Sequence, residues 1–319
     1  MSGCMATDKR IQILLSTYNG EKYLRQQLDS YLSQTCIQQI RVLIRDDGSS
    51  DGTGEILREY AAAYGFEVFL GGNIGINASY QWLITHSNCN CDYFAFSDQD
   101  DVWMPDKISK AVSMLDARSS EKPVLFASRS QITDASLKPI GTSVLPVRGI
   151  SFYNAMVQNV LPGHTQVFNR ALRNVLCAHG CEEVQMVDWW VYLTAAAVGE
   201  IAFAKESLVL HRQHGDNSVG YQLGLFFRLK QRIQALKQGK GNTISRQLLA
   251  FRNSWGVALP KEYAQELEDY LDSLGGFFSR GAYLCRSRVF RQKTIENQAF
   301  RLLYLLGKYN LDKGEYHGV

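Results

Sequence analysis

The stretch YFAFSDQDDVW, residues 93–103, turns from an aromatic apolar run into three carboxylates within four residues. The apolar run predicts a buried strand that ends where the carboxylates begin. Open α/β sheets bind ligands at the carboxyl ends of their strands, so these acids are candidates for a ligand site. The structural alternative is a surface turn or a helix N-cap, since both favour Asp. Pro105 suits the first turn of the helix that should follow.

The spacing of two of these acids indicates metal binding. Asp98 and Asp100 are two residues apart, and in an extended chain both side chains point the same way. Two such carboxylates repel each other unless a cation lies between them. The candidate cations are Mg²⁺ and Mn²⁺, which prefer oxygen ligands and can share them with phosphate groups.

Three further strand–helix pairs precede this stretch. Apolar runs at residues 11–16, 40–44 and 66–70 predict strands. Helical periodicity follows each run, at 21–34, 53–64 and 77–87. This alternation predicts an α/β fold, Rossmann-like, with a mostly parallel sheet and helices on both of its faces. We expect residues 1–220 to form this domain.

Each predicted strand ends in a polar or glycine-rich loop. In a parallel sheet all of these ends lie along one edge, so loops that are distant in sequence should converge there. The side chains expected to meet at this edge are Tyr18, Asp46, Asp47, Asn73, Asp98 and Asp100. Each of these loops alone would be interpreted as a turn. The prediction therefore rests on the parallel topology of the sheet.

Residues 124–213 mix strand and helix signals. Strands are expected at 124–128, 163–169, 201–204 and 207–211, with the last two paired to each other. Helices are expected at 170–178 and from Asp188 to about Val198. Residues 138–150 should form a loop or mobile flap, and residues 212–218 a polar loop.

Residues 221–319 are predicted to form a basic helical region. Apolar stripes run from Leu225 to Leu236 and again within residues 280–308, each among Lys and Arg. This region carries 16 Lys and Arg against 8 Asp and Glu, a net charge of +8, whereas residues 1–220 carry 18 against 23, a net of −5. The basic region is expected to pack on the first domain, to form a homodimer interface or to contact an anionic membrane surface. No nucleic-acid-binding motif accompanies the charge.

Composition bounds the class of protein. With 319 residues, 45% hydrophobic and 20% charged, the chain can bury a sizeable core. Seven cysteines, an odd number, are expected to be reduced thiols of a cytoplasmic protein. Residues 1–10 show no signal-peptide pattern, and no apolar run is long enough for a membrane span. The expected location is therefore the cytoplasm, either free or on the inner face of the plasma membrane.

Three motifs in this order resemble the family 2 inverting glycosyltransferases with the GT-A fold. They are STYNGE at 16–21, RDDGSSDGT at 45–53 and SDQDDVW at 97–103, and the resemblance covers about residues 11–218. Within that family, residues 98–101 together with DWW at 188–190 and RQH at 212–214 look most like bacterial rhamnosyltransferases. Those enzymes use dTDP-rhamnose to build cell-wall polysaccharides or O-antigens, so the resemblance implies this donor and a glycan or lipid-linked glycan acceptor. A UDP-hexose or UDP-N-acetylhexosamine is the alternative donor.

The resemblance implies a nucleotide pocket and a metal site. A carboxylate can accept the imide N–H of uracil or thymine, and an aromatic ring can stack on the base. The implied nucleotide-sugar-binding residues are Thr17, Tyr18, Asn19, Asp46, Asp47, Asn73 and Asp98. The implied metal ligands are Asp100, Asp98 and His214, holding Mg²⁺ or Mn²⁺ against the leaving diphosphate. A solvated loop histidine is the alternative for His214.

Asp188 resembles the general base of the family. An inverting transfer is one in-line displacement, and it needs a carboxylate opposite the leaving group to take the proton of the acceptor hydroxyl. Relatives often place a second polar residue before this Asp, but Val187 stands here, which leaves Glu182 and Glu183 as weaker candidates. A helix N-cap is the structural alternative for Asp188. His164 is a candidate acceptor contact or a satisfied strand histidine, and His211 is read as structural.

Three other functions are weighed against a transferase. A nucleotidyltransferase typically begins with a glycine-rich basic loop, and none occurs near residues 14–20. A dehydrogenase is disfavoured because no G-x-G-x-x-G follows the first strand. A non-catalytic carbohydrate-binding or scaffold protein would carry a decayed site, whereas Asp46, Asp98, Asp100 and Asp188 are all present.

Overall fold

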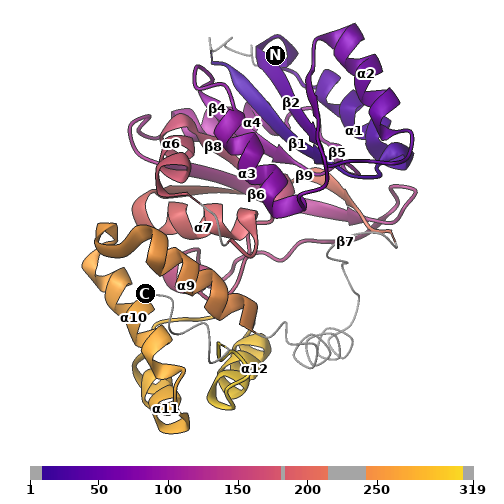
Figure 1. Cartoon of the computed structure of the whole chain (residues 1–319). Helices are drawn as coiled ribbons and strands as arrows, with labels where there is room; N and C mark the ends of the chain where they lie inside the picture. The colour runs from indigo at the N-terminus through magenta and orange to yellow at the C-terminus, as the bar shows by residue number, and fades with distance from the viewer. Residues whose placement is uncertain (1–8, 181–183, 215–241, 312–319) are drawn as a thin grey trace. The chain divides into compact units, whose positions relative to one another are not determined.

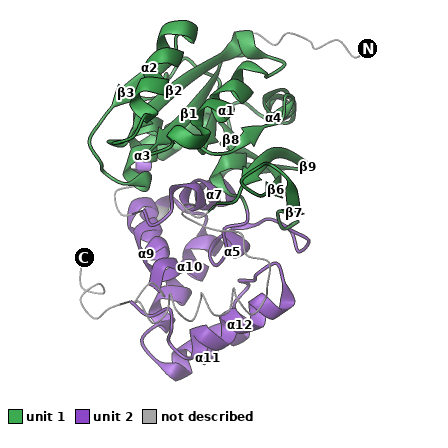
Figure 2. Ribbon diagram, turned by 90° about the vertical axis from the view of Figure 1, so that its right-hand side faces the viewer, with its two compact units in different colours: residues 1–145, 161–178, 199–220 green, residues 146–160, 179–198, 221–319 purple. Residues whose placement is uncertain are grey.

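The computed structural model describes residues 9–180, 184–214 and 242–311. The chain divides into two compact units, which Figure 2 colours separately. Unit 1 comprises residues 1–145, 161–178 and 199–220, and unit 2 comprises 146–160, 179–198 and 221–319. Residues 146–160 and 179–198 therefore group with the C-terminal helices, although the predicted boundary near residue 220 assigns them to the first domain.

The first half of unit 1 is a parallel sheet built from alternating strands and helices (Figure 1). Its elements are β1 (Ile11–Thr17), α1 (Glu21–Leu32), β2 (Ile40–Asp46), α2 (Thr53–Tyr64), β3 (Glu67–Leu70), α3 (Ile76–His86) and β4 (Tyr93–Ser97). The strands lie in the order β3-β2-β1-β4 with parallel neighbours. Thr17 is in register with Asp46, and Leu15 with Ser97, so the carboxyl ends of three strands share one edge.

The second half of the sheet is mixed. β8 (Val167–Asn169) pairs antiparallel with both β4 and β6 (Val124–Thr133), and β9 (Glu200–Arg212) runs parallel to β6. β5 (Val102–Trp103) pairs antiparallel with β9, and β7 (Pro139–Thr142) with β6. The α/β class is confirmed, but parallel pairing dominates only the first half.

Three local expectations need correction. Residues 201–204 and 207–211 are parts of the single strand β9, because β6 offers a partner along its whole length and a register shift at Arg129 absorbs the interruption. Residues 139–142 form β7 rather than part of a loop, since β6 also has a free edge there. Pro105 precedes the N-cap residue Asp106 of α4 (Lys107–Asp116), so it lies outside the first helical turn.

Helices cover both faces of the sheet. The main core joins the sheet to the apolar faces of α1, α2 and α4, with Leu28, Leu57 and Ile108 fully or almost fully buried. On the other face Tyr80 of α3 packs its ring 4.9 Å from that of Phe96 on β4. Helix α6 (Arg170–His179) follows β8 directly. The periodicity of each helix is therefore explained by the sheet face that it buries.

Unit 2 is helical, as the sequence predicts for the C-terminal region. It contains α5 (Phe152–Ala155), α7 (Val187–Val198), α9 (Thr243–Trp255), α10 (Lys261–Ser273), α11 (Phe277–Arg286) and α12 (Thr294–Leu305). Trp190 of α7 meets Phe251 of α9 edge to face at 5.2 Å, which explains why α7 groups with the later helices. The predicted stripe from Leu225 to Leu236 lies outside the described residues. Among the described helices, none combines the length and hydropathy that a membrane crossing requires.

Candidate active site

The loops after β1 and β2 are tied together by side chains. The Thr17 hydroxyl donates to Asp46 at 2.8 Å, and the same carboxylate accepts from the backbone N–H of Ser49 at 2.9 Å. The Asn19 amide oxygen accepts from the Ser50 N–H at 2.8 Å. Thr17 and Asp46 are buried, whereas the Tyr18 side chain stands 50% exposed. Of this group, Tyr18 offers the accessible ring that a nucleotide base could stack on.

Asp47 has a structural task that its sequence context does not reveal. Its buried carboxylate forms an ion pair with Arg45 and accepts the backbone N–H groups of Ile74 at 2.8 Å and Gly75 at 2.9 Å. Arg45 in turn donates to the Gly72 carbonyl at 2.9 Å. The pair therefore shapes the loop after β3, and three donors already occupy the carboxylate that was predicted to face the nucleotide.

The loops after β2 and β3 approach each other closely at Gly48. This residue has a φ of +83°, and a Cβ added there would lie 3.0 Å from the backbone nitrogen of Asn73. Only glycine combines this backbone conformation with such close packing at low cost. Asn73 is exposed beside this contact, so the structure brings the predicted residues Asp46, Asp47 and Asn73 to one corner of the edge.

Gln99 joins the acidic loop to the first loop. Its side-chain oxygen accepts from the Tyr18 N–H at 2.8 Å, and its nitrogen donates to the Tyr18 carbonyl at 3.0 Å. The residue between Asp98 and Asp100 thus fixes the backbone of Tyr18 from both sides. The predicted convergence of these two loops is present in the structure.

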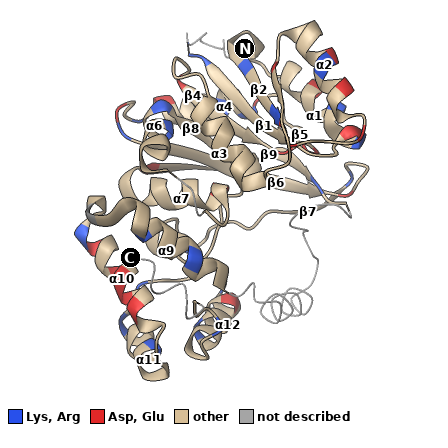
Figure 3. Cartoon of the chain, viewed as in Figure 1, with Lys and Arg blue, Asp and Glu red and all other residues tan. Residues whose placement is uncertain are grey.

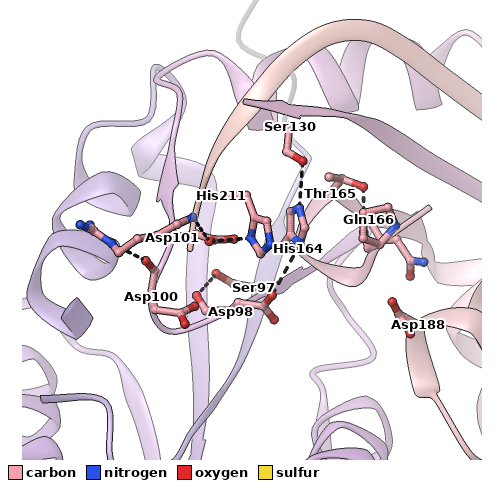
Figure 4. Close-up of polar contacts among 12 residues, drawn as sticks. Ser97, Asp98, Asp100, Asp101, Ser130, His164, Thr165, Gln166, Asp188 and His211 are labelled. Carbon is pink, nitrogen blue, oxygen red and sulfur yellow. Dashed lines mark hydrogen bonds and ion pairs between the residues drawn. The ribbon is translucent and has the colours of Figure 1, made fainter. Parts of the chain in front are cut away.

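Asp98 contacts an imidazole and a phenol, and Figure 4 shows the imidazole of His164 beside it. His164 Nδ1 is 3.5 Å from Asp98 Oδ2, and the Tyr80 hydroxyl is 3.3 Å from Asp98 Oδ1. Burial opposes ionisation of Asp98, but His164 outweighs it and holds the pKa of that carboxyl below its ordinary value. The contact with His164 therefore favours the charged form of Asp98.

Asp101 is fully buried and only half satisfied. Its Oδ1 accepts from His211 Nδ1 and from the backbone N–H of Arg212, both at 3.0 Å. Its Oδ2 is buried and has no hydrogen-bond partner. His211 stacks on His164 with 4.2 Å between ring centroids and 8° between planes. Burial would lower the pKa of His211, but Asp101 prevails and raises it to about 9.

Asp98, Asp101, His164 and His211 form the strongest candidate for a metal-binding group among the residues described here. One ligand atom from each lies within 4.8 Å of the others. Two carboxylates and two imidazoles suit a divalent ion, and the unpartnered Asp101 oxygen is a ligand atom without another task. Only Asp98 of this group was predicted as a ligand. The sequence did signal Asp101, because it is the third acid of the motif at 98–101. Nothing in the spacing of His164 and His211 indicates that they come together.

Asp100 and His214 make a second pair in the same loop region. His214 Nε2 lies 2.8 Å from Asp100 Oδ2, so two of the predicted metal ligands do come together. The His214 ring also lies 4.7 Å from that of Tyr23. Burial, and then repulsion from Asp101 and Asp98, raises the pKa of Asp100 to about 6. A bound cation would relieve that repulsion, so the electrostatics of the pair favour one.

Arg212 fixes the backbone beneath these acids. Its guanidinium donates to the Asp100 carbonyl at 2.8 Å and to the Ala135 carbonyl at 2.6 Å. The guanidinium also covers the Tyr23 ring at 4.5 Å. Arg212 was predicted to begin a polar loop, but it closes β9 and is buried, because the acidic loop and β9 meet through β5.

Lys107 is a buried cation under the same group. Its ammonium donates to the His164 carbonyl at 2.8 Å and lies 3.2 Å from the Trp103 ring centroid. Burial holds the pKa of Lys107 well below its ordinary value, although Asp101 and Asp98 oppose this shift. Lys107 thus supports the acidic loop from the core side.

Asp188 lies in unit 2, in the first turn of α7. Its carboxylate accepts from the Asn159 amide at 2.9 Å and from the Trp189 N–H at 2.8 Å. Because α7 begins at Val187, Asp188 lies inside the helix and does not occupy the N-cap position that was the structural alternative. Trp189 and Trp190 are buried in the core of unit 2, and Glu182 and Glu183 lie outside the described residues.

Comparison with known proteins identifies a family that the chain resembles. Residues 12–133, which span the three loops and the carboxylate motif, match the family described as glycosyl transferase family 2. We refer to these matched residues as the family 2 domain. They include Asp46, Asp98, Asp100 and Asp101, whereas His164, His211 and His214 come from beyond the matched range.

Curated relatives of the family 2 domain include bacterial proteins. The dTDP-rhamnosyl transferase RfbG of Shigella flexneri is 26% identical over 246 residues, covering 71% of this chain and 80% of RfbG. An uncharacterized protein of Mycobacterium tuberculosis is 29% identical over 213 residues, which is 64% of this chain. The aligned part spans 59% of the length of that mycobacterial relative.

Solved structures confirm the fold. The crystal structure of S. aureus TarS 1-349 in complex with UDP-GlcNAc is 16% identical, with a TM-score of 0.55, and the match covers 94% of this chain and 88% of that chain. This likeness shows the GT-A fold that the sequence motifs of the family 2 domain predict.

Proposed function

We propose that this protein is a metal-dependent inverting glycosyltransferase. It moves rhamnose from dTDP-rhamnose onto a glycan or lipid-linked glycan acceptor during synthesis of a bacterial cell-surface polysaccharide. The family 2 domain supports the reaction class, and the similarity to RfbG, a dTDP-rhamnosyl transferase, supports the donor. A cytoplasmic location, a membrane surface and a homodimer remain parts of this proposal that rest on composition and charge.

The observation that carries the proposal is the crowding of acids and imidazoles at the end of β4. Asp98, Asp100 and Asp101 lie within four consecutive positions, and their partners His164, His211 and His214 come from other parts of the chain. Mg²⁺ or Mn²⁺ held there by Asp98, Asp100 and His214, or by the group around Asp101, would supply positive charge against the departing diphosphate. The chain's own residues hold the carboxylates in place. Arg212 bonds the Asp100 carbonyl, and the Gln99 side chain ties the acidic loop to the backbone of Tyr18.

The nucleotide would bind beside this group, along the same edge. The exposed ring of Tyr18 is suited to stack on the base, and Asn73 and the loop held by Asp46 and Asp47 would border it. Thr17 and Asn19 act by holding the loops. The Thr17 side chain already bonds Asp46, and the Asn19 side chain bonds the Ser50 N–H.

We assign the general base to Asp188. In the step, the acceptor oxygen forms a bond to the anomeric carbon as the bond to the diphosphate oxygen breaks, and the acceptor proton goes to a carboxylate. Asn159 would orient Asp188 by the 2.9 Å hydrogen bond. Asp188→Asn should therefore abolish transfer to the acceptor while leaving donor binding intact.

The test is donor binding and slow hydrolysis with purified full chain. The panel is dTDP-rhamnose, UDP-glucose, UDP-galactose and UDP-N-acetylglucosamine, each with and without Mn²⁺ or Mg²⁺. We expect metal-dependent binding and turnover of dTDP-rhamnose that Asp100→Asn removes and that the exposed control Glu55→Gln retains.

Other outcomes discriminate between the alternatives. Preference for a UDP-sugar would keep the transferase and overturn the rhamnose donor. Binding of a sugar nucleotide without turnover, with every acceptor tried, would favour a carbohydrate-binding or scaffold protein. Failure of the folded protein to bind any donor would contradict the proposal as a whole.

A further inference from the structure

Large apolar side chains are exposed where α11 begins and where α12 ends. Phe278 is 88% exposed and Phe277 53%, and on α12 Leu302 is 58% and just beyond it Leu306 is 55% exposed. The two phenylalanines start α11, where they cannot reach the core that Tyr283 and Leu284 fill from the same helix. Exposed aromatic side chains next to one another are unusual on a surface that meets only water.

These four side chains come from the neighbouring ends of two helices. Arg280 in the first turns of α11 donates to the Leu305 carbonyl at the end of α12, at 3.0 Å. A Cβ added to Gly281 would lie 3.7 Å from a Leu305 methyl carbon, and Arg301 bonds the Leu284 carbonyl. The helices are therefore antiparallel neighbours, and the start of α11 lies beside the end of α12. Figure 2 shows both helices within unit 2. We call Phe277, Phe278, Leu302 and Leu306 the Phe278 surface.

The chain around the Phe278 surface is strongly basic. Residues 277–311 contain seven Lys and Arg and one acid, Glu296. Figure 3 shows acids gathered on α10, where Glu262 pairs with Arg288 and Asp269 with Arg286. Lys308 lies two residues beyond Leu306 and Lys293 just before α12, both exposed, and the described acids form no ion pair with either.

We propose that the Phe278 surface attaches the protein to an anionic lipid bilayer. Aromatic and leucine side chains would enter the region between headgroups and acyl chains. Lys308 beside them, and Lys293 at the opposite end of α12, would bind anionic headgroups. A second copy of this chain fits less well, since a twofold interface would place this basic surface against itself. This assignment locates the membrane contact that is part of the proposed function, but it does not depend on the proposed reaction. An acceptor carried on a lipid would make such attachment useful.

The test is sedimentation of the full chain with vesicles. Vesicles of phosphatidylcholine mixed with phosphatidylglycerol should bind the protein, and phosphatidylcholine alone should bind it far less. The double variant Phe277→Ser, Phe278→Ser should lower the apparent affinity by about tenfold or more, because two aromatic rings no longer leave water. Lys308→Glu should weaken binding and reduce its dependence on salt.

Matched control variants test whether vesicle binding depends on this surface or on exposed apolar and charged side chains in general. Val147→Ser removes another apolar side chain, 73% exposed in unit 2, and Lys261→Glu reverses another exposed lysine; both should bind vesicles like the wild type. All variants should retain the circular dichroism of the wild type and its metal-dependent donor binding. Equal binding by the double variant, or no binding by folded wild type, would overturn the proposal. So would a wild-type dimer that the double variant converts to monomers without any change in vesicle binding.

Discussion

Two acidic loops, after β2 and after β4, present similar residues at the same edge of one sheet and behave differently. Asp46 and Asp47 are buried, and Thr17, Ser49, Arg45 and two backbone N–H groups satisfy them. Asp98, Asp100 and Asp101 repel one another, and one Asp101 oxygen lacks a partner. The first loop uses carboxylates to build the edge, and the second keeps them under electrostatic strain that a cation would relieve. Paired Asp residues in a sequence do not distinguish these two uses.

The largest expected effect tests the structural side of this comparison. Asp47→Ala leaves Arg45 buried without its partner, which should cost about 3–5 kcal/mol in the free energy of unfolding. Urea unfolding followed by fluorescence would measure it, with Glu55→Ala as the exposed control. The loss should be the same with and without Mn²⁺. A loss under about 1 kcal/mol would show that the two loops do not differ in this way.

Asp100→Asn tests the other loop. Donor turnover should fall by about 10²-fold or more, since one preorganised charge opposite the leaving group is lost. Without metal the variant should be at least as stable as the wild type, because the raised pKa of Asp100 means that its ionised form is disfavoured in the folded protein. If Asp100→Asn unfolded as readily as Asp47→Ala, Asp100 would have a structural role like that of Asp47.

The pair of His211 and Asp101 should give a change with pH. The folded-state pKa of His211 is about 9, above the ordinary 6.5, so its charged form stabilises the fold fully below about pH 6.5. That contribution is lost as the pH rises through 9. The difference in unfolding free energy between wild type and His211→Gln should therefore shrink from pH 6 to pH 9.5 in metal-free buffer. The exposed His86→Gln is the control, and a constant difference for His211→Gln would contradict the ion pair.

The smallest effect concerns how closely the loops after β2 and β3 approach. Gly48→Ala forces a left-handed backbone on a residue with a Cβ and presses it against Asn73, which should cost about 1–2 kcal/mol. Gly54 in α2 is the matched control, since its added Cβ would meet nothing nearer than an Arg58 nitrogen at 3.7 Å. Gly54→Ala should be neutral or stabilising by roughly 0.5–1 kcal/mol. Equal effects at both positions would argue against the tight corner.

The sequence predicted the first half of the fold well because its signals are local. Each strand from β1 to β4 is a short apolar run followed by an amphipathic helix, and parallel crossovers leave few alternatives for their order. The second half depends on pairings between distant segments, such as β5 with β9, and no short-range pattern encodes those. The edge strand β7 carries too few residues for a periodicity to emerge. Of the strand expected at 163–169 only β8 forms, since residues 163–165 are a 3-10 helix.

The candidate site also has a part that the sequence predicts and a part that depends on distant segments. Asp98, Asp100 and the loop residues were predictable because each follows a recognisable strand. The group of Asp98, Asp101, His164 and His211 depends on how β9 and the 3-10 helix Gly163–Thr165 return to the acidic loop. The spacing of Arg45 and Asp47 is compatible with an ion pair, since side chains two residues apart in an extended chain point the same way. The backbone donors of Ile74 and Gly75 were hidden because they come from the loop after β3.

Arg212 has a consequence for how the chain is made. The guanidinium that holds the Asp100 carbonyl lies 112 residues later in the sequence. A ribosome adding roughly 5–20 residues per second exposes the acidic loop about 6–20 s before its anchor exists. During that interval β4 and β6 emerge ahead of β8 and β9, with edges open to neighbouring nascent chains. The pace of translation across this interval therefore sets the time during which aggregation competes with completion of the sheet.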